Sequence, residues 1–424
     1  MTYQESLDYL YGLQKFGIKL GLENIRTFLS LLGHPEKEFK TVLVAGTNGK
    51  GSVASALAEM TRRSGIRTGL YTSPHLHSFS ERIRVDGAMI PEEGIARLVA
   101  EMRPLAASLS LTFFEFTTAL ALVYFAGQGV ELAILEVGLG GRLDSTNAVD
   151  PVLSVITPIA NDHQEHLGDT LAQISREKAG IMRAGIPVVS SRQCREVSEA
   201  LNREAERVGT TVLMSPDDFD YSEQGDAFDY HGIHLVIPGV RPGVEGRHQF
   251  GNMTTALAAA EMLGDAGFPV TGETMQAGVE SMTWPGRLEW FHDRSVLLDG
   301  AHNGAAANVL ARYLGEQGIR NVRWIVGMKA DKNVREILAP IAPYAAEIYS
   351  VEPPVEEAVP VEVLRSEADR IGCPARSFAT PENALRTALE ESEEKGIILV
   401  AGSLFLVSAI RELLLREGDR SCGE

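Results

Sequence analysis

Apolar residues recur along the chain in two alternating patterns. Short runs rich in Val, Ile and Leu are followed by longer segments whose apolar residues recur every three or four positions. A short run bounded by Gly, Pro or polar residues predicts a buried strand, and the longer spacing predicts an amphipathic helix. Strands that alternate with helices predict an α/β fold, with a mostly parallel sheet covered by helices on both faces.

The first series of elements follows a helical segment over residues 1–33. An antiparallel excursion is expected at residues 226–236, after the last strand of this series. We expect strands at 41–44, 67–71, 80–85, 132–137, 152–157 and 187–189, and helices at 53–60, 91–109, 113–125, 171–182, 195–208, 253–266 and 274–281.

The pattern pauses at Trp284-Pro285-Gly286-Arg287, and a second, smaller α/β series follows. A chain of 424 residues is too long for one average domain. We therefore expect a P-loop-type domain over residues 1–288 and a smaller Rossmann-like domain over residues 293–424. The second series comprises strands at 296–299, 322–326, 347–351 and 397–401, and helices at 305–316, after Lys332 and at 404–415.

Composition narrows the classes of function. A formal net charge of −18 argues against nucleic acid as the main partner, because a phosphate backbone needs a basic face. No apolar run is long enough to span a membrane, and the start of the chain, with Glu5 and Asp8, is unlike a signal peptide. Three widely spaced cysteines suit neither a zinc site nor a disulfide framework, so we expect a cytoplasmic protein.

Residues 44–52, Val-Ala-Gly-Thr-Asn-Gly-Lys-Gly-Ser, join a predicted strand to a predicted helix. Glycines let backbone N–H groups approach a phosphate, Lys50 adds positive charge, and Ser52 or Thr47 can reach Mg²⁺. The usual P-loop has Ser or Thr directly after the Lys, whereas Gly51 intervenes here. An ordinary strand–turn–helix is the plainer interpretation, but the clustering of Lys50 and hydroxyls favours a nucleotide site.

Polar residues follow other predicted strands, at the sheet edge where ligands bind. Glu136 ends an apolar strand, and Ser73 and His163 follow two others. Carboxylate and hydroxyl oxygens suit Mg²⁺, and a histidine suits a metal or a phosphate. A solvated strand end, a simple turn and a structural histidine are the alternatives. Lys178 lies in a helix with an apolar opposite face, which by itself predicts a surface lysine.

Further candidates lie at a helix start and near the pause in the pattern. The cluster Phe113–Phe116 suits core packing and a flat aromatic wall for a ring-shaped ligand equally well. Asn252 lies at a helix start, and Arg287, Asp299 and His302 lie near the first strand of the second series. Residues at an interdomain seam can bridge a ligand, Asp299 through ribose hydroxyls and Arg287 through triphosphate charge.

The motifs together are more specific than any one of them. They resemble folylpolyglutamate synthase, including the bacterial bifunctional dihydrofolate synthase form, within the Mur ligase superfamily. The resemblance extends from about residue 10 to residue 410. The motifs that carry it are Gly46-Thr47-Asn48-Gly49-Lys50-Gly51-Ser52, Thr72-Ser73-Pro74-His75-Leu76, residues 136–147 (EVGLGGRLDSTN), Asp162-His163, Glu177-Lys178-Ala179-Gly180-Ile181, His248-Gln249-Phe250-Gly251-Asn252, Trp284-Pro285-Gly286-Arg287 and Asp299-Gly300-Ala301-His302-Asn303.

The resemblance implies an ATP-dependent amide ligase that adds L-glutamate to folates through an acyl phosphate. It also implies dihydropteroate as a second acceptor. The domain of residues 1–288 would hold ATP and the folate, the domain of residues 293–424 would be the glutamate-ligase domain, and the protein would act as a monomer. Three alternatives are a regulatory P-loop NTPase, a Rossmann oxidoreductase built on Gly138–Gly141, and a Mur-type ligase for a cell-wall or peptide substrate.

The resemblance also assigns roles to residues. Lys50, Lys178 and His163 would be catalytic, with Lys178 carbamylated so that its charge becomes negative. ATP would be bound by Thr47, Asn48, Gly49, Lys50, Gly51, Ser52, Asn252, Arg287, Asp299 and His302. Mg²⁺ would be held by Ser52, Ser73, Glu136 and His163, and the substrates would contact Phe114, Asp144 and Ser403.

Overall fold

The computed structural model describes residues 1–17, 19, 21–391 and 396–421. The chain forms two compact units. The first comprises Met1–Gly243 and Gln249–Met282, and the second comprises Val244–His248 and Thr283–Glu424. Residues 244–248 therefore pack with the second unit although they precede the last helices of the first. The functional assignment of residues 1–288 and 293–424 stays a prediction.

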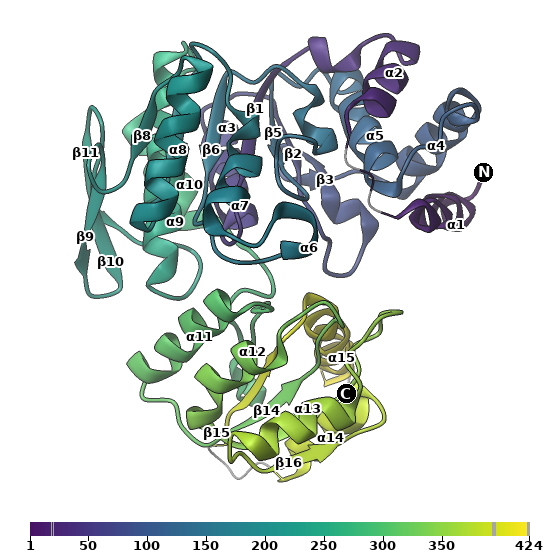
Figure 1. Cartoon of the computed structure of the whole chain (residues 1–424), viewed down its shortest axis with the longest axis vertical. Helices are drawn as coiled ribbons and strands as arrows, with labels where there is room; N and C mark the ends of the chain where they lie inside the picture. Colours follow the sequence, from purple (N-terminus) through teal and green to yellow (C-terminus); the bar gives the residue numbers. More distant parts are fainter. Residues whose placement is uncertain (18, 20, 392–395, 422–424) are drawn as a thin grey trace. The chain divides into compact units, whose positions relative to one another are not determined.

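The first unit is built on an eight-stranded sheet in the order β4-β3-β2-β5-β1-β6-β7-β8. The neighbouring strands β2, β5, β1, β6, β7 and β8 pair in parallel. At the edge beside β2, the strands β3 and β4 are added by antiparallel pairing. Helices lie in front of and behind this sheet (Figure 1). The strands are β1 (Lys40–Ala45), β2 (Thr68–Tyr71), β3 (Ile83–Val85), β4 (Ala88–Met89), β5 (Leu132–Glu136), β6 (Leu153–Ile156), β7 (Val188–Ser190) and β8 (Val212–Met214).

Several helices of this unit begin at a threonine whose hydroxyl accepts the N–H of the third helical residue, as Thr112 and Thr170 do. The helix after Thr112 is apolar on all sides because it is buried. The helices are α1 (Tyr3–Gly12), α2 (Glu23–Leu31), α3 (Lys50–Arg63), α4 (Glu92–Ala106), α5 (Phe113–Gly127), α6 (Gln164–Leu167), α7 (Leu171–Lys178), α8 (Arg195–Val208), α9 (His248–Asp265) and α10 (Gly272–Ser281), with 3₁₀ turns η1 (Leu13–Phe16), η2 (Pro35–Lys37), η3 (Phe79–Arg82), η4 (Ser145–Ala148) and η5 (Ala179–Ile181).

The expected antiparallel excursion is a three-stranded sheet of β9 (Asp220–Gln224), β10 (Ala227–His231) and β11 (Val236–Val240). Buried Glu261 of α9 ties it to the unit by accepting hydrogen bonds from the Tyr230 hydroxyl at 2.5 Å and from the His234 N–H at 2.7 Å. The small sheet is thus fastened to the helix that also carries Asn252.

The second unit has a six-stranded sheet in the order β12-β13-β17-β14-β15-β16, parallel except for the edge pair β12–β13. Its core lies around Trp324, Leu297 and Leu399. The elements are β12 (Glu289–Phe291), β13 (Val296–Leu298), β14 (Val322–Val326), β15 (Ala345–Ser350), β16 (Ala375–Ser377), β17 (Ile398–Ala401), α11 (Gly304–Glu316), α12 (Val334–Ile341), α13 (Val361–Arg370), α14 (Pro381–Glu391), α15 (Leu404–Ser421), η6 (His292–Arg294) and η7 (Ala342–Tyr344).

The prediction of an α/β fold with two mostly parallel sheets is confirmed. Several local predictions were wrong or incomplete. The strand expected at 80–85 begins with the turn η3, and the helix expected at 171–182 ends at Lys178 and continues as η5. Sequence analysis missed β4, β8, β12, β16, α6, α13 and α14. These four strands have only two or three residues each, which is too short for a period-two pattern to emerge.

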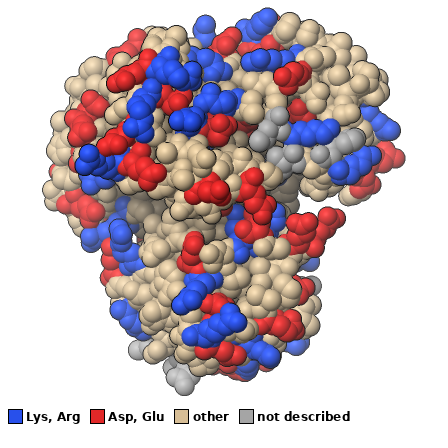
Figure 2. Space-filling view, in the orientation of Figure 1, with Lys and Arg blue, Asp and Glu red and all other residues tan. Residues whose placement is uncertain are grey.

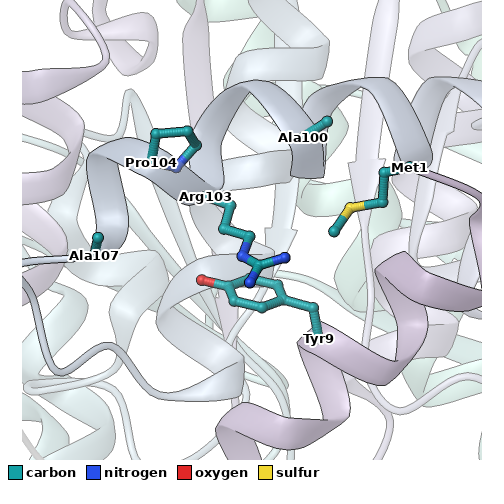
Figure 3. Close-up of a pocket in the computed structure, with 6 residues that line it drawn as sticks. All are labelled: Met1, Tyr9, Ala100, Arg103, Pro104 and Ala107. Carbon is teal, nitrogen blue, oxygen red and sulfur yellow. The ribbon is translucent and has the colours of Figure 1, made fainter.

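On the face that Figure 2 shows, basic and acidic residues are intermixed. Among the ion pairs of the first unit, Glu204 of α8 pairs with Arg142, Arg176 and Arg207. Among the described helices, none combines the length and the apolar character that crossing a bilayer requires. A hollow of about 420 Å³ beside α1 and α4 is lined by Met1, Tyr9, Ala100, Arg103, Pro104 and Ala107, with the Arg103 guanidinium 5.1 Å from the centre of the Tyr9 ring (Figure 3).

Candidate active site

The predicted phosphate loop connects central strand β1 to α3. Gly49 precedes the helix with φ +86°, a left-handed conformation that favours glycine. A Cβ at Gly49 would lie 2.4 Å from Oδ1 of Asn252. The first hydrogen bond of the helix runs from the Val53 N–H to the Gly49 carbonyl, so the N–H groups of residues 50–52 precede it. These N–H groups form the positive end of α3, as an anion site requires.

Hydrogen bonds to the segment that follows β6, the strand beside β1, hold the phosphate loop in place. The N–H groups of Thr47 and Asn48 donate to the Pro158 carbonyl at 3.0 and 3.2 Å. The Thr47 hydroxyl donates to the Ala160 carbonyl and accepts the Ala160 N–H, both at 3.1 Å. Thr47 therefore fastens the loop to the segment after β6, and its predicted contact with ATP stays a prediction. The strand β1 lies between β5 and β6, so the order of the strands reverses direction there. The loop follows the carboxyl end of β1 at this position, which is where ligands bind in open α/β sheets.

Two lysines approach the loop from different elements. Lys50 Nζ lies 3.2 Å from the Thr47 carbonyl oxygen, and Lys178 Nζ donates to the Gly46 carbonyl at 2.7 Å. Lys178 is only 4% exposed, so the surface position that its helix pattern predicted was wrong. Burial, together with the nearby Lys50 charge, lowers the pKa of Lys178 to about 7. Only the family motif indicated that this lysine belongs to the site.

Oxygen donors gather at the carboxyl ends of neighbouring strands. Glu136 ends β5 and is buried, and its Oε2 accepts the N–H of Ser73 at 3.1 Å, just after β2. Ser52 is buried in the first turn of α3, after β1. Within the described residues, no three His, Cys, Asp or Glu side chains are placed to hold a metal by themselves. This small set of protein oxygens suits Mg²⁺, because Mg²⁺ usually binds only a few protein oxygens and completes its coordination shell with phosphate and water oxygens.

His163 lies apart from the buried core of the unit. It is the N-cap of the short helix α6 with φ +50°, and its side chain is 39% exposed. Its Nε2 lies 3.9 Å from Oδ1 of Asp162, whose side chain is mostly buried. The roles of His163 as a metal ligand and catalytic group stay predictions.

The loop after β5 uses the carboxylate of Asp144 for its own structure. Asp144 is buried and accepts the N–H of Leu139 at 2.8 Å, the N–H of Thr146 at 3.0 Å and the Thr146 hydroxyl at 2.6 Å. Burial raises the pKa of this carboxyl. Phe114, at the start of α5, lies against Gly138, where a Cβ would come 2.5 Å from the Phe114 Cζ. The substrate contacts of Phe114 and Asp144 stay predictions.

Gly138–Gly141 does not form a dinucleotide-binding turn, because the segment leads into the 3₁₀ turn η4 and not into a long helix. The Rossmann oxidoreductase alternative therefore loses its structural basis. One residue that the motif analysis passed over is Arg82, a buried arginine at the end of η3. The sequence signal was a charged run, Glu81-Arg82-Ile83-Arg84, separated by four residues from the Thr72–Leu76 motif.

In the second unit, Asp299 and His302 follow β13, and Arg287, which precedes β12, lies close to Gly300 at the same strand end. In chain order β13 is the second strand of this unit and not the first. Buried Asp299 accepts the N–H of Leu288 at 3.0 Å and the N–H of Ala301 at 2.9 Å, and burial raises its pKa although Arg287 opposes this. A Cβ at Gly300 would lie 2.0 Å from Arg287 Nη1.

Two further predicted residues have local partners. His302 Nδ1 lies 2.8 Å from the Gly300 carbonyl oxygen. The buried Ser403 hydroxyl accepts the Phe405 N–H at 3.2 Å, at the start of α15. Asn252, in the first unit, is buried and donates to Gln249 Oε1 at 2.8 Å. The contacts of these residues with nucleotide or glutamate stay predictions.

Comparison with known proteins identifies the family. The model of the Mur ligase middle domain matches residues 44–260, and that of the Mur ligase glutamate ligase domain matches residues 286–404. The dihydrofolate synthase/folylpolyglutamate synthase of Bacillus subtilis is 34% identical, over 97% of this chain and 99% of the relative. The chain belongs to the folylpolyglutamate and dihydrofolate synthase family of Mur ligases. A Haloferax volcanii relative, a probable bifunctional folylpolyglutamate synthase/dihydropteroate synthase, is also 34% identical, but the chain spans half of its length.

Solved structures of this Mur ligase family have the same fold. Mycobacterium tuberculosis folylpolyglutamate synthase complexed with ADP matches with a TM-score of 0.89 and 31% identity, over 97% of this chain and 98% of that chain. The bifunctional folylpolyglutamate synthase/dihydrofolate synthase of Yersinia pestis, complexed with AMPPNP and Mn ion, matches with a TM-score of 0.88 and 31% identity, over 98% of each chain. The predicted family, fold class and enzyme class are confirmed.

Proposed function

We propose that the protein is an ATP-dependent ligase that adds L-glutamate to folates and also to dihydropteroate. The observation that carries this proposal is the loop of residues 46–52, which presents α3 N–H groups and Lys50 next to Glu136 and the buried Lys178. The names of the Bacillus and Yersinia relatives, which combine both synthase activities, support the two acceptors.

The loop binds the β- and γ-phosphates of ATP. Its N–H groups and the Lys50 ammonium offset the phosphate charge, and the bonds from Thr47 and Asn48 to the segment after β6 keep the loop in place. Positioning and charge neutralisation supply most of the catalysis in phosphoryl transfer. ADP and AMPPNP in the two related structures support a nucleotide at this loop.

A carboxylate is a poor electrophile, so the acceptor is activated first. A carboxylate oxygen of the acceptor attacks the γ-phosphorus, and ADP leaves. The amine of glutamate then attacks the acyl carbon of the acyl phosphate, loses a proton and displaces inorganic phosphate. An amide forms, and one ATP becomes ADP and phosphate.

The oxygen donors of the site fit Mg²⁺. Ser52, Ser73, Glu136 and His163 are the residues that would hold it, and the Mn ion in the Yersinia structure supports a divalent cation in this family. When bound, the cation supplies neutralisation of phosphate charge. Glu136 contributes the buried negative charge that such a cation requires, and the Ser73 N–H keeps that carboxylate oriented.

Lys178 is carbamylated in the active enzyme. Carbon dioxide reacts with a neutral amine, and burial makes the neutral form of Lys178 accessible near pH 7. The product carries a negative charge in place of a positive one, which relieves the repulsion between Lys178 and Lys50. The carbamate then orients the cation beside the phosphate loop.

The remaining predicted residues complete the proposal. Asn252, Arg287, Asp299 and His302 contact the nucleotide, Ser403 lies on the glutamate side, and Phe114 and Asp144 form the acceptor site. The predictions of a monomer and of a cytoplasmic location belong to the same proposal.

The test is a ligation assay on the purified full chain with ATP, Mg²⁺, L-glutamate and either dihydropteroate or tetrahydrofolate. We expect products heavier by one or more glutamyl residues, detected by mass spectrometry, with both acceptors. Lys50→Ala should abolish ligation without unfolding the protein. The matched control is Lys40→Ala, an exposed lysine at the start of β1, which should leave ligation unchanged. ATP turnover that is indifferent to glutamate and acceptor would instead indicate a regulatory NTPase.

A further inference from the structure

Gln193 lies between the end of β7 and the start of α8, and its side-chain amide bonds to the segment that follows β6. Its Oε1 accepts the N–H of Ile159 at 3.0 Å, and its Nε2 donates to the Thr157 carbonyl at 3.1 Å. In a parallel pair, a residue bonds in this way to the two backbone groups on either side of its partner, which here is Pro158. The amide therefore continues the pairing of β6 with β7 past Ile156, the last residue of β6.

The same segment holds the phosphate loop. The Pro158 carbonyl accepts the N–H groups of Thr47 and Asn48 at 3.0 and 3.2 Å. The N–H and the carbonyl of Ala160 both bond to the Thr47 hydroxyl at 3.1 Å. Because proline donates no hydrogen bond of its own, the bonds of its neighbours must fix its position. Gln193 fixes the residues on both sides of Pro158, and Pro158 in turn holds the loop.

The backbone that carries Gln193 is itself held in place. Ser191 donates its N–H to the Ile156 carbonyl at 2.9 Å, and its hydroxyl lies 2.8 Å from the Thr255 hydroxyl of α9. Ser190, which is fully buried, accepts a further hydrogen bond from Nε2 of Gln193 at 3.3 Å. A long side chain on a mobile backbone would lose more entropy on forming such bonds than one on a fixed backbone. The amide can therefore hold the segment after β6 at a fixed distance from β7.

The phosphate loop and a proposed cation ligand both depend on this segment. Beyond Ala160 the chain continues to His163, one of the residues that would hold Mg²⁺. A shift of the segment would move the N–H groups of the loop and His163 together. Phosphoryl transfer depends on alignment, and a displacement of about 1 Å that arises far from the chemistry can slow a reaction about 100-fold.

We propose that Gln193 is a positioning residue, which aligns the phosphate loop with the cation ligand His163 through the segment of residues 157–160. This inference rests on the proposed function. A carboxamide presents a donor and an acceptor in one plane, as a peptide group does, and both are used here. Gln193 touches no substrate in this assignment, and it acts through the backbone groups of Thr157 and Ile159.

Two substitutions test the two ends of the amide. Gln193→Met has nearly the length of glutamine but forms neither hydrogen bond, and Gln193→Glu keeps the acceptor but loses the donor to the Thr157 carbonyl. Both should lower kcat/KM for ATP, about 10- to 100-fold in Gln193→Met. The affinity for ADP, measured by calorimetry without acceptor or glutamate, should fall about tenfold in Gln193→Met. The Mg²⁺ concentration for half-maximal turnover should rise, whereas the KM for glutamate should stay unchanged.

Two control variants separate positioning from a loss of stability. Arg192→Met changes the preceding residue, whose guanidinium bonds to Asp220 at 3.0 Å, and should leave the ATP kinetics unchanged. Thr68→Val removes a buried hydroxyl that donates to the Ile66 carbonyl at 2.9 Å, at the start of β2. Because β2, β5 and β1 run parallel, this end of the sheet is opposite the phosphate loop. Thr68→Val should therefore lower the Tm without changing kcat/KM for ATP.

A folded Gln193→Met with unchanged kcat/KM for ATP and unchanged ADP affinity would overturn the inference. An equal rise in the KM for glutamate would do so too, as would an equal loss of kcat/KM for ATP in Thr68→Val, since either would indicate general damage. If Gln193→Met does not fold, unchanged ATP kinetics in Gln193→Glu would overturn it. A wild type that binds ADP but shows no glutamate-dependent turnover would refute the proposed function itself, and the ADP affinities would still test the role of Gln193.

Discussion

Gly49→Ala tests how closely the phosphate loop depends on its neighbour α9. The substitution places a side chain at φ +86°, a left-handed conformation that costs an L-residue about 1–2 kcal/mol. The new Cβ would also lie 2.4 Å from Oδ1 of Asn252. Asn252 is buried and held by Gln249 Oε1 at 2.8 Å, so it yields little, and such overpacking costs about 1–3 kcal/mol more. We expect a total destabilisation of about 2–5 kcal/mol.

Gly65→Ala separates backbone strain from steric overlap. Gly65 follows the other end of α3 with a similar φ of +79°, and a Cβ there would meet nothing within 4 Å. Gly65→Ala should therefore cost only the strain, about 1–2 kcal/mol. Because Gly49→Ala displaces the first N–H groups of α3, the KM for ATP should rise at least about tenfold in that variant only.

Thermal unfolding and ATP kinetics of both variants check the reasoning. Adding Asn252→Ala to Gly49→Ala removes the overlapping oxygen, so the double variant should be more stable than the sum of the two single effects. Equal stability losses for Gly49→Ala and Gly65→Ala, with no change in the KM for ATP, would refute the argument from the Asn252 contact.

Further predictions follow from the other buried groups. Lys178→Ala should lose ligation, and added bicarbonate or short carboxylates should restore part of it; a fully active variant would remove the carbamate proposal. Because burial lowers the pKa of Lys178 from 10.5 to about 7, the cost of burying this lysine is present in full below pH 7. The cost declines as the pH rises from 7 to 10.5, since over this range the unfolded chain binds the proton and the folded protein does not. A carbamate signal from ¹³C-labelled bicarbonate should grow as the pH rises through 7, where the folded protein gains the neutral amine. Asp144→Ala should lower the unfolding free energy by about 1–3 kcal/mol in urea titrations, more than Thr146→Val, because it removes an acceptor for three donors.

Hydrophobic spacing predicted most of the elements near their observed bounds. The strands β1, β5 and β14 and helices such as α5 and α8 are long or strongly patterned, so their apolar faces are visible in the sequence. The strands β8, β12 and β16 were missed because three residues are too few to show a period-two pattern, so that only their pairing with neighbouring strands defines them. Helices α13 and α14 were missed although both have amphipathic spacing.

The sequence by itself determined the α/β class, the phosphate loop and the family, because these depend on local motifs and on the order of apolar runs. Tertiary structure alone decided which polar groups lose their water. It buried Lys178 beside Gly46, engaged Asp144 in its own loop and placed the Arg82 guanidinium carbon 5.3 Å from the centre of the Phe113 ring. Desolvation and pairing arise between residues that are distant in the sequence, and no local pattern encodes them.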